Sequence, residues 1–338
     1  MLNLVYVTSS MVFDPNITQK PAYPIFVPGV QKNRLADMGA IDQRSDPLAW
    51  LEERLANDPN LGHYVHFQTK ETMSSQGSKH VARCRDRTNV SYTDYAGAVD
   101  TGFFQINNQD AIEFVSGYGK KQIKLAVDFL SGSADYRRQR GGGRGQAIAK
   151  ACGLKGSRGW SPTVLDATAG LAGDAFVLAG EGCAVTLCER HPVPYLLVAD
   201  AIRRMELVEE GRVKMSQLPL GETPLATAEE DTQSVHSLSS SKQNAVTFDI
   251  VYLDPMYSEE GKKQHPAAGK GMQILQSEVG ADTDADQLLE RALSVANYRV
   301  VVKRAKSAPY LGGRAPTRSE RGKSTRFDLY CLKSPPGR

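Results

Sequence analysis

The segment Asp249-Ile-Val-Tyr-Leu-Asp254-Pro255-Met256-Tyr257 joins an apolar run to an acid, a proline and an aromatic residue. The exocyclic amine of a nucleobase is a poor nucleophile because its lone pair is delocalised into the ring. If Asp254 and the Pro255 carbonyl accept its two N–H hydrogens, the nitrogen is oriented and its lone pair is localised. Tyr257 can stack on the base. These residues therefore predict catalysis on an exocyclic amino group.

A second pattern, Val164–Phe176, has the features of a cofactor-binding turn. Asp166 ends an apolar stretch, and small residues including Thr168 and Gly170 lead into a predicted helix. Gly170 allows close approach of the backbone to a ligand, and a helix beginning near Gly173 offers free N–H groups to an anion.

Another acid, Glu189, ends the next apolar stretch 23 positions after Asp166. An acid at that strand tip is placed to accept hydrogen bonds from ribose hydroxyls, which predicts an adenosine-containing cofactor. A nicotinamide dinucleotide is the rival, but its G-x-G-x-x-G pattern would have glycine where Thr168 stands. This difference favours S-adenosylmethionine.

Alternating strand and helix signals after Trp160 position these residues and predict an α/β fold. The expected fold is a Rossmann-like class I methyltransferase with a mainly parallel sheet, helices on both faces and a smaller N-terminal α+β domain. The expected strands are 123–130, 163–167, 184–189, 213–216, 248–253, 299–303 and 327–332; the expected helices are 46–55, 145–152, 174–179, 194–205 and 284–296.

The chain divides by composition into three parts. Residues 1–120 are predicted to form the small N-terminal domain, of unknown role. Residues 121–160 form a basic, Gly/Arg-rich connecting segment, and residues 161–338 form the methyltransferase domain. A stretch rich in Ser, Thr, Glu and Gln, at about 219–245, is predicted to be an insertion between two strands.

Two basic clusters indicate a surface that binds a nucleic-acid backbone. One lies in the Gly/Arg-rich segment and the other spans residues 303–326, where Glu320 is the sole acid. Arginine can also stack on unpaired bases, and the target base must be unstacked to reach Asp254. The predicted RNA-binding residues are Arg137, Arg138, Arg140, Arg144, Lys303, Arg304 and Arg326.

Composition excludes other protein classes. The net charge is +3 in 338 residues, and the five cysteines are scattered without a C-x-x-C pair, so a zinc site or disulfide framework is not expected. No apolar stretch approaches the ~20 residues that span a bilayer. We therefore expect a cytoplasmic protein with no metal and no membrane partner; the sequence does not predict its oligomeric state.

Taken together, the motifs resemble the ribosomal RNA small subunit methyltransferase J family. Asp254-Pro-Met-Tyr257 is similar to the (Asn/Asp)-Pro-Pro-(Tyr/Phe) signature of methyltransferases acting on exocyclic amines, with Met256 in place of the second proline. Further similarity covers roughly residues 122 to 332, in the segments 127–129, 137–138, 141–145, 149–150, 166–170, 174–179, 189–190, 252–256, 301–304 and 326–328.

The resemblance implies N2-methylation of one guanosine in 16S ribosomal RNA, as naked RNA or in the small subunit. It implies cofactor contacts at Gly173, Asp174, Glu189, Arg190 and Asp254. This sequence departs from the family pattern in two places: Ala172-Gly173 replaces Gly-Arg, and His191 replaces asparagine. The family also has a small polar pair after the third strand, which Ser216 matches, with His236-Ser237 as the alternative.

The residues alone are compatible with two other functions. A methyltransferase acting on adenine N6 would use the same amine chemistry. A non-catalytic RNA-binding assembly protein with a decayed cofactor pocket would agree with the departures at Ala172 and Gly173. A nicotinamide-dependent oxidoreductase is disfavoured because Asp254-Pro-Met-Tyr257 would have no role in it.

Overall fold

The protein was analysed as a computed structural model, which describes most of the C-terminal two thirds of the chain and shorter N-terminal segments. The described ranges are 3–8, 23–26, 46–57, 65–68, 102–117, 122–131, 143–156, 159–208, 217–219, 247–256, 269–279 and 285–336.

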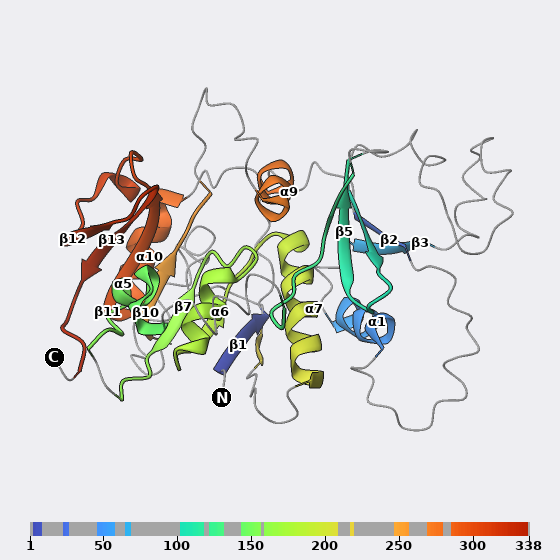
Figure 1. Ribbon diagram of the computed structural model, residues 1–338, viewed down its shortest axis with the longest axis horizontal. Helices are drawn as coiled ribbons and strands as arrows, with labels where there is room; N and C mark the ends of the chain where they lie inside the picture. Colours follow the sequence, from blue (N-terminus) through green and yellow to red (C-terminus); the bar gives the residue numbers. More distant parts are fainter. Residues whose placement is uncertain are drawn as a thin grey trace, which may run out of the picture.

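The larger of two sheets has eight strands in the order β12-β13-β11-β10-β7-β8-β1-β9 (Figure 1). All neighbouring pairs from β11 to β9 are parallel, whereas β13 runs antiparallel to both β11 and β12. The strands are β1 (Asn3–Thr8), β7 (Thr163–Asp166), β8 (Ala184–Leu187), β9 (Gln217–Pro219), β10 (Phe248–Leu253), β11 (Ala296–Ala305), β12 (Arg318–Arg321) and β13 (Thr325–Cys331).

Strand order reverses direction between β7 and β10. From β7 the chain continues outward through β8, whereas β10 and β11 lie on the other side of β7. In open α/β sheets ligands bind at the carboxyl ends of the strands at such a switch point. Asp166 ends β7 and Asp254 follows β10, so both acids lie at this edge.

Helices cover both faces of this sheet, as expected from the sequence. Successive strand residues point to opposite faces: Tyr252 and Val301 pack with α5 (Ala147–Ala151), α6 (Gly173–Gly180) and α7 (Pro192–Val208). Val251 and Val302 pack on the other face with α10 (Ala285–Val295). The described part of the domain also contains α9 (Lys270–Glu278) and a 3-10 turn at Leu311–Gly313.

The smaller sheet is mixed, in the order β3-β2-β4-β5-β6. Strand β2 is parallel to β3 and β4, and the β4-β5 and β5-β6 pairs are antiparallel. Helix α1 (Pro47–Asn57) begins after Asp46, whose side chain caps the helix by accepting a hydrogen bond from Leu48 N at 2.8 Å. The strands are β2 (Tyr23–Phe26), β3 (Val65–Gln68), β4 (Phe103–Ile106), β5 (Ile112–Ser116) and β6 (Ile123–Leu125).

Helix α7 lies between the two sheets and joins them (Figure 1). The apolar cluster on this side is continuous and includes Trp50 and Phe114 together with residues of the large sheet. Asp200 of α7 is 0% exposed. Its carboxylate accepts hydrogen bonds from Ile112 N at 3.0 Å and from Arg203 at 2.8 Å, so a buried ion pair anchors the start of β5.

Several expected boundaries change. The predicted strand 123–130 ends at Leu125, and the predicted helix 145–152 is a 3-10 turn, Gly143–Gly145, followed by the short α5. The expected strand 213–216 lies outside the described residues, which include β9 directly after it. The predicted insertion also lies outside them, apart from Pro219.

Strand β1 pairs with β8 and β9 in the large sheet, although it belongs to the segment predicted to form the N-terminal domain. The division of the chain at residue 120 stays a prediction. No helix in the described part of the chain is long and apolar enough to cross a bilayer. The described residues also contain no group of three or more His, Cys, Asp or Glu side chains suited to a metal ion.

Candidate active site

Strand register brings the candidate residues together on one face of the large sheet. Leu253 pairs with Val302, so Asp254 and Lys303 come next to each other, one residue farther along their strands. Lys303 pairs on its other side with Phe327 of β13. Asp254, Lys303 and Phe327 therefore form one row across β10, β11 and β13, on the face that α5 and α6 cover.

The turn after β7 links the two predicted halves of the site. Thr168 accepts a hydrogen bond from Asp254 N through its Oγ1 at 2.6 Å. Two residues later, Gly170 N donates to Glu189 Oε2 at 2.8 Å. Gly170 has φ +53°, a left-handed conformation that favours glycine. One short turn thus connects the β10 tip to the β8 tip.

A charged cluster, formed by Asp174, Lys303 and Asp254, occupies this edge. Lys303 Nζ lies 2.9 Å from Asp174 Oδ2 and 2.9 Å from Asp254 Oδ2. Buried Tyr252 donates its hydroxyl to Asp174 Oδ2 at 2.8 Å. Two carboxylates share one ammonium group, so the cluster retains one excess negative charge when all three groups are ionised.

The environment shifts the pKa values in this cluster. Burial raises the pKa of Asp254, and the Lys303 ammonium opposes that rise. Burial acts to lower the pKa of Lys303, but the Asp254 and Asp174 carboxylates outweigh it, so this pKa is raised. Lys303 therefore stays a cation, whereas the raised pKa of Asp254 means that this carboxylate takes up a proton at a higher pH than an ordinary aspartate.

Asp166 is more enclosed than we expected for a cofactor contact. Its side chain is 2% exposed, and burial raises its pKa well above the usual range. Oδ1 accepts a hydrogen bond from Thr168 N at 3.2 Å. In this arrangement Asp166 shapes the turn after β7, and a role in cofactor binding would be indirect.

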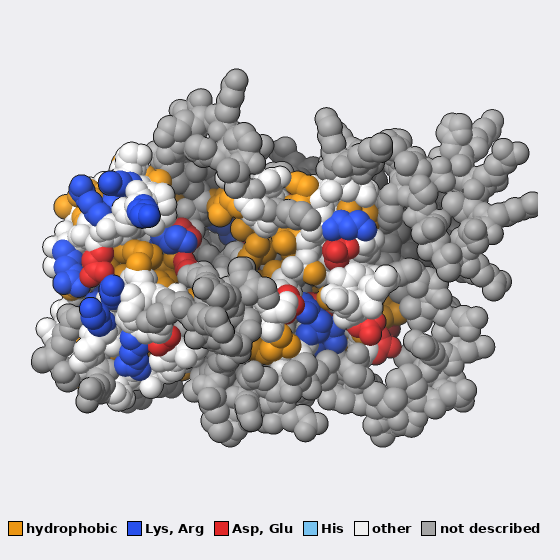
Figure 2. Space-filling view, viewed as in Figure 1, with side chains coloured by type: hydrophobic (Ala, Val, Ile, Leu, Met, Phe, Trp, Pro, Cys, Tyr) orange, Lys and Arg blue, Asp and Glu red, His pale blue; other side chains and the backbone are white. Residues whose placement is uncertain are grey.

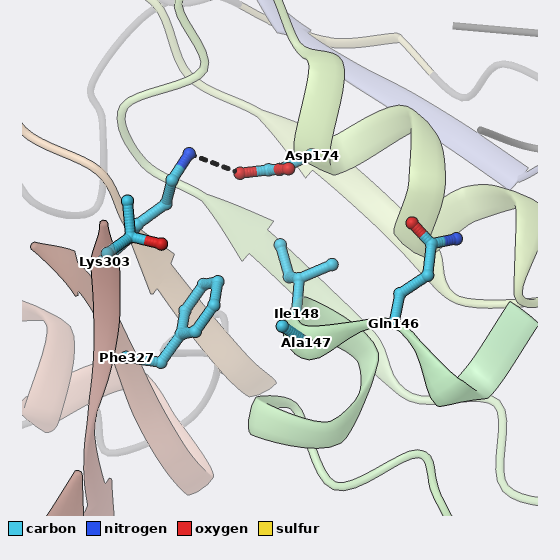
Figure 3. A pocket seen from close by; sticks show the side chains of 7 residues that line it. Gln146, Ala147, Ile148, Asp174, Lys303 and Phe327 are labelled. Carbon is cyan, nitrogen blue, oxygen red and sulfur yellow. Dashed lines mark hydrogen bonds and ion pairs between the residues drawn. The ribbon is translucent and has the colours of Figure 1, made fainter. Parts of the chain in front are cut away.

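A pocket of about 240 Å³ lies beside the charged cluster (Figure 3). In the figure Lys303 and Phe327 come from neighbouring strands, Asp174 comes from the start of α6, and Ile148 and Gln146 lie across from them. The walls combine an aromatic ring and an aliphatic chain with an acid, a cation and an amide. The described lining residues are Gln146, Ala147, Ile148, Asp174, Lys303, Thr325 and Phe327.

The residues around the turn suit S-adenosylmethionine. Ala172, the N-cap of α6, has φ +56° and a side chain without a hydrogen-bond acceptor, so it cannot cap the first-turn N–H groups. Gly173 is exposed at that helix start and leaves room for a ligand carboxylate. Glu189 and Arg190, both partly exposed, follow β8, where ribose hydroxyls are expected.

Glu189 already accepts two backbone hydrogen bonds, from Gly170 N and, at 2.7 Å, from His191 N. Each carboxylate oxygen has a second lone pair, so the side chain can still accept from a ribose. The Asp174 carboxylate accepts hydrogen bonds from both Lys303 and Tyr252 through Oδ2.

Some predicted residues lie outside the described part of the chain: Tyr257, Ser216, the alternative His236-Ser237, and the arginines Arg137, Arg138 and Arg140. Pro255 is buried directly after Asp254, at the position where its carbonyl was expected to act. The roles of all these residues remain predictions.

Three of the predicted RNA-binding arginines, Arg304, Arg326 and Arg144, make contacts within the fold. Arg304 and Arg326 are 6% and 5% exposed. Arg326 pairs with Asp328 at 2.9 Å and donates to the Lys306 carbonyl at 2.9 Å; Arg304 donates to the Pro309 carbonyl at 3.4 Å. Their guanidinium groups make contacts inside the fold, and the RNA-binding role of these two residues stays a prediction.

Arg144 is only partly exposed and holds three segments together. Its guanidinium donates to the carbonyls of Leu154, Trp160 and Glu181 at 3.4, 3.1 and 3.2 Å. Lys303, also predicted to bind RNA, lies in the charged cluster. The sequence could not separate these structural arginines from surface cations, because both kinds of residue occur in the same basic runs.

The second basic run, residues 303–326, also contains exposed cations, and these lie on the surface of the C-terminal strands. Figure 2 shows Lys and Arg side chains gathered over β11, β12 and β13. Lys306, Arg321 and Lys323 are exposed near the β12-β13 turn, and Lys306 N donates to the Ser324 carbonyl at 3.0 Å. We call these three residues the basic turn. Because β13 is antiparallel to β11, this turn lies at the sheet edge that carries Asp254 and Lys303.

Comparison with known proteins identifies the family. A family model described as "Putative SAM-dependent methyltransferase" matches residues 97–332. The ribosomal RNA small subunit methyltransferase J of Saccharophagus degradans is 48% identical over 219 residues, which cover 64% of this chain and 79% of the relative. The chain belongs to the ribosomal RNA small subunit methyltransferase J family. The motif-based resemblance is thereby confirmed.

Other relatives give similar values. The family member of Haemophilus influenzae (strain KW20 / Rd) is 46% identical over 226 residues, 67% of this chain and 82% of that protein. Among solved structures, a SAM-dependent methyltransferase of Neisseria gonorrhoeae is 31% identical, with a TM-score of 0.43, and the match covers 68% of this chain and 82% of that one. Membership of the family makes this protein an S-adenosylmethionine-dependent methyltransferase.

Proposed function

We propose that this methyltransferase modifies the exocyclic N2 amine of a guanosine in 16S ribosomal RNA. The observation that carries the proposal is the position of Asp254. It lies at the switch point of the sheet, and a 2.6 Å hydrogen bond joins its backbone to the turn that approaches Glu189. The names of the relatives support ribosomal RNA as the substrate.

The residues of this edge prepare the amine for reaction. The Asp254 carboxylate accepts one N–H hydrogen and the Pro255 carbonyl accepts the other, which directs the nitrogen lone pair out of the base plane. The negative charge of Asp254 also stabilises positive charge that develops on this nitrogen. The methylated amine then loses one proton, which water or Asp254 can accept.

Bound S-adenosylmethionine supplies the electrophilic methyl group. Gly170 and the open first turn of α6, at Gly173 and Asp174, would hold its amino-acid part. Glu189 and Arg190 would contact its nucleoside part. Asp166 accepts a hydrogen bond from Thr168 N and so holds the turn that carries Thr168 and Gly170 in place for the cofactor.

A labelled-methyl assay tests this function. Ribosomal RNA and small subunits from cells lacking the protein are incubated with the purified enzyme and S-adenosylmethionine, and the product is digested to nucleosides. We expect N2-methylguanosine in the 16S RNA. Label in N6-methyladenosine would instead identify an adenine methyltransferase, and the absence of label from both substrates would contradict the proposal. Comparing naked RNA with the assembled subunit identifies the substrate form.

A further inference from the structure

Lys303 presents one hydrogen-bond donor that the fold does not use within the described residues. An ammonium group has three donors. Two of them are directed to Asp174 Oδ2 and Asp254 Oδ2, each at 2.9 Å. The side chain is 27% exposed and lines the pocket beside the charged cluster. A ligand in this pocket that offers an acceptor near Asp254 can therefore complete the coordination of Lys303.

The pocket has the size and walls for one planar nucleobase. Its volume of about 240 Å³ is below the roughly 300–1,000 Å³ typical of pockets for drug-sized ligands. Phe327 lies in the same row as Lys303 and Asp254, and Ile148 is on the opposite wall (Figure 3). A nucleobase can use these apolar surfaces while its polar edge meets Lys303 and reaches past the lining residues to Asp254, whose Oδ2 lies 2.9 Å from the Lys303 ammonium.

Together, Lys303 and Asp254 present a donor followed by two acceptors. The ammonium donates, and the two carboxylate oxygens accept. Oδ2 already accepts from Lys303 but has a second lone pair available. This order of donor, acceptor and acceptor is also that of the pairing edge of cytosine. Its complement is the guanine edge, which presents O6 as an acceptor and N1–H and N2–H as donors.

We propose that Lys303 is a specificity-determining residue that donates to guanine O6 while Asp254 accepts hydrogen bonds from N1–H and N2–H. The inference rests on the proposed function and explains how the site selects guanine over adenine. Adenine carries an amino donor where guanine has O6 and an acceptor at N1. A base with that pattern would place a donor against the ammonium and a lone pair against the carboxylate, and both contacts would be repulsive.

The test compares two bases at the same nucleotide. Once the methylated nucleotide is mapped, 16S RNA is assembled by splinted ligation with guanine or 2,6-diaminopurine at that position. Diaminopurine keeps the 2-amino group but reverses the hydrogen-bonding sense at positions 1 and 6. The wild-type enzyme should methylate the guanine RNA much faster. In Lys303→Met the ratio of the two kcat/KM values should fall by about 10- to 100-fold, which corresponds to one charge-assisted hydrogen bond.

Variants distinguish recognition of guanine by Lys303 from an indirect effect of Lys303 on Asp254. Lys303→Arg keeps a cationic donor and should retain more of the ratio than Lys303→Met. Lys333→Met removes an exposed lysine beyond the opposite end of β13 and should leave the ratio unchanged. Equal rates of the wild-type enzyme on the two RNAs would overturn the inference without any variant. So would a Lys303→Met enzyme that is slower on both RNAs by the same factor, because Lys303 would then only support Asp254.

These outcomes are distinct from failure of the proposed function. If the wild-type enzyme forms no N2-methylguanosine, the function itself is wrong. If it forms N2-methylguanosine but the ratio does not depend on Lys303, the function stands and the role of Lys303 in selecting the base is wrong.

Discussion

Asp254 and Lys303 depend on each other at the scale of single residues. The carboxylate needs the cation to remain ionised in a partly buried place, and the cation needs both neighbouring carboxylates to offset its own loss of hydration. A substitution of either residue therefore changes the charge state of the other as well as removing a contact.

Asp254→Ala should lower the rate of methyl transfer by at least about 100-fold, because it removes an acceptor and the charge opposite the developing cation. The rate is measured at saturating S-adenosylmethionine, whose affinity should fall only modestly. The matched control is Asp249→Ala at the other end of β10, where the carboxylate accepts from Thr163 N at 2.9 Å. A rate for Asp254→Ala within a few-fold of wild type would contradict this role.

The pH dependence should follow the ionisation of Asp254. The amine is captured by the carboxylate, so activity is complete above the raised pKa of Asp254 and declines as the pH falls through it. Lys303 lowers this pKa, whereas Asp174 raises it. Lys303→Met should therefore move the acidic limb of the kcat/KM profile to higher pH. The exposed Lys333→Met variant should keep the wild-type limb, and an unmoved limb in Lys303→Met would contradict the coupling.

At the scale of elements, two similar hydrogen bonds join β7 to β10. Thr168 Oγ1 accepts from Asp254 N at 2.6 Å at the reactive edge, and Thr163 Oγ1 accepts from Asp249 N at 2.9 Å at the opposite edge. The same type of side chain holds both ends of one strand pair, so a substitution at one end has a natural control at the other.

Thr168→Val and Thr163→Val should each lower the free energy of unfolding by about 1 kcal/mol, because each removes one hydrogen-bond acceptor at nearly constant volume. Only Thr168→Val should also lower kcat, since it releases the Asp254 backbone. Chemical denaturation and single-turnover methylation measure the two effects. Equal kcat values in the two variants would show that the Thr168 hydrogen bond does not position Asp254.

The sequence predicted these elements where local signals were strong. The apolar run of β10 and the glycine and acid at the start of α6 placed both elements within about a residue of their observed bounds. The strand expected at 123–130 was too long, because apolar residues continue after Leu125 without pairing. Strand β1 could not be assigned to the large sheet, because its pairing with β8 joins segments about 180 residues apart.

In the active site, too, contacts between segments far apart in the sequence could not be predicted. Asp254, Glu189 and Gly170 could be found from the residues that precede and follow them. Lys303 was interpreted as a surface cation, because its two carboxylate partners lie 129 and 49 positions away in the chain. Strand alternation could have identified Lys303, because Lys303 lies two residues after Val301 and so on the same sheet face as Val301 and Tyr252.

At the scale of the whole molecule, the exposed positive charge of the C-terminal strands lies at the reactive edge. The basic turn is formed by Lys306, Arg321 and Lys323, all exposed. A nucleic-acid backbone that crosses this turn would present its bases toward the pocket, and each neutralised phosphate releases bound counterions.

Arg321→Gln and Lys323→Gln should weaken binding of the 16S RNA and reduce the slope of log affinity against log salt by about 1 for each lost phosphate contact. Lys333→Gln is the control, because Lys333 is an exposed lysine beyond the opposite end of β13. The slopes are measured by titration at several salt concentrations. A slope unchanged in both turn variants would place the RNA on another surface.

The buried Asp200 has a practical consequence for attempts to isolate the catalytic part. Ile112 N donates to Asp200, the Asp110 carbonyl accepts from Arg203, and Trp50 lies under the Arg203 guanidinium. A shortened chain that begins after residue 120 would lose all three contacts and expose the Asp200–Arg203 ion pair to solvent, together with the apolar surface that Trp50 and Phe114 now cover. Biochemists who need a minimal methyltransferase should therefore retain the preceding segment, even though it contributes no residue to the reaction proposed here.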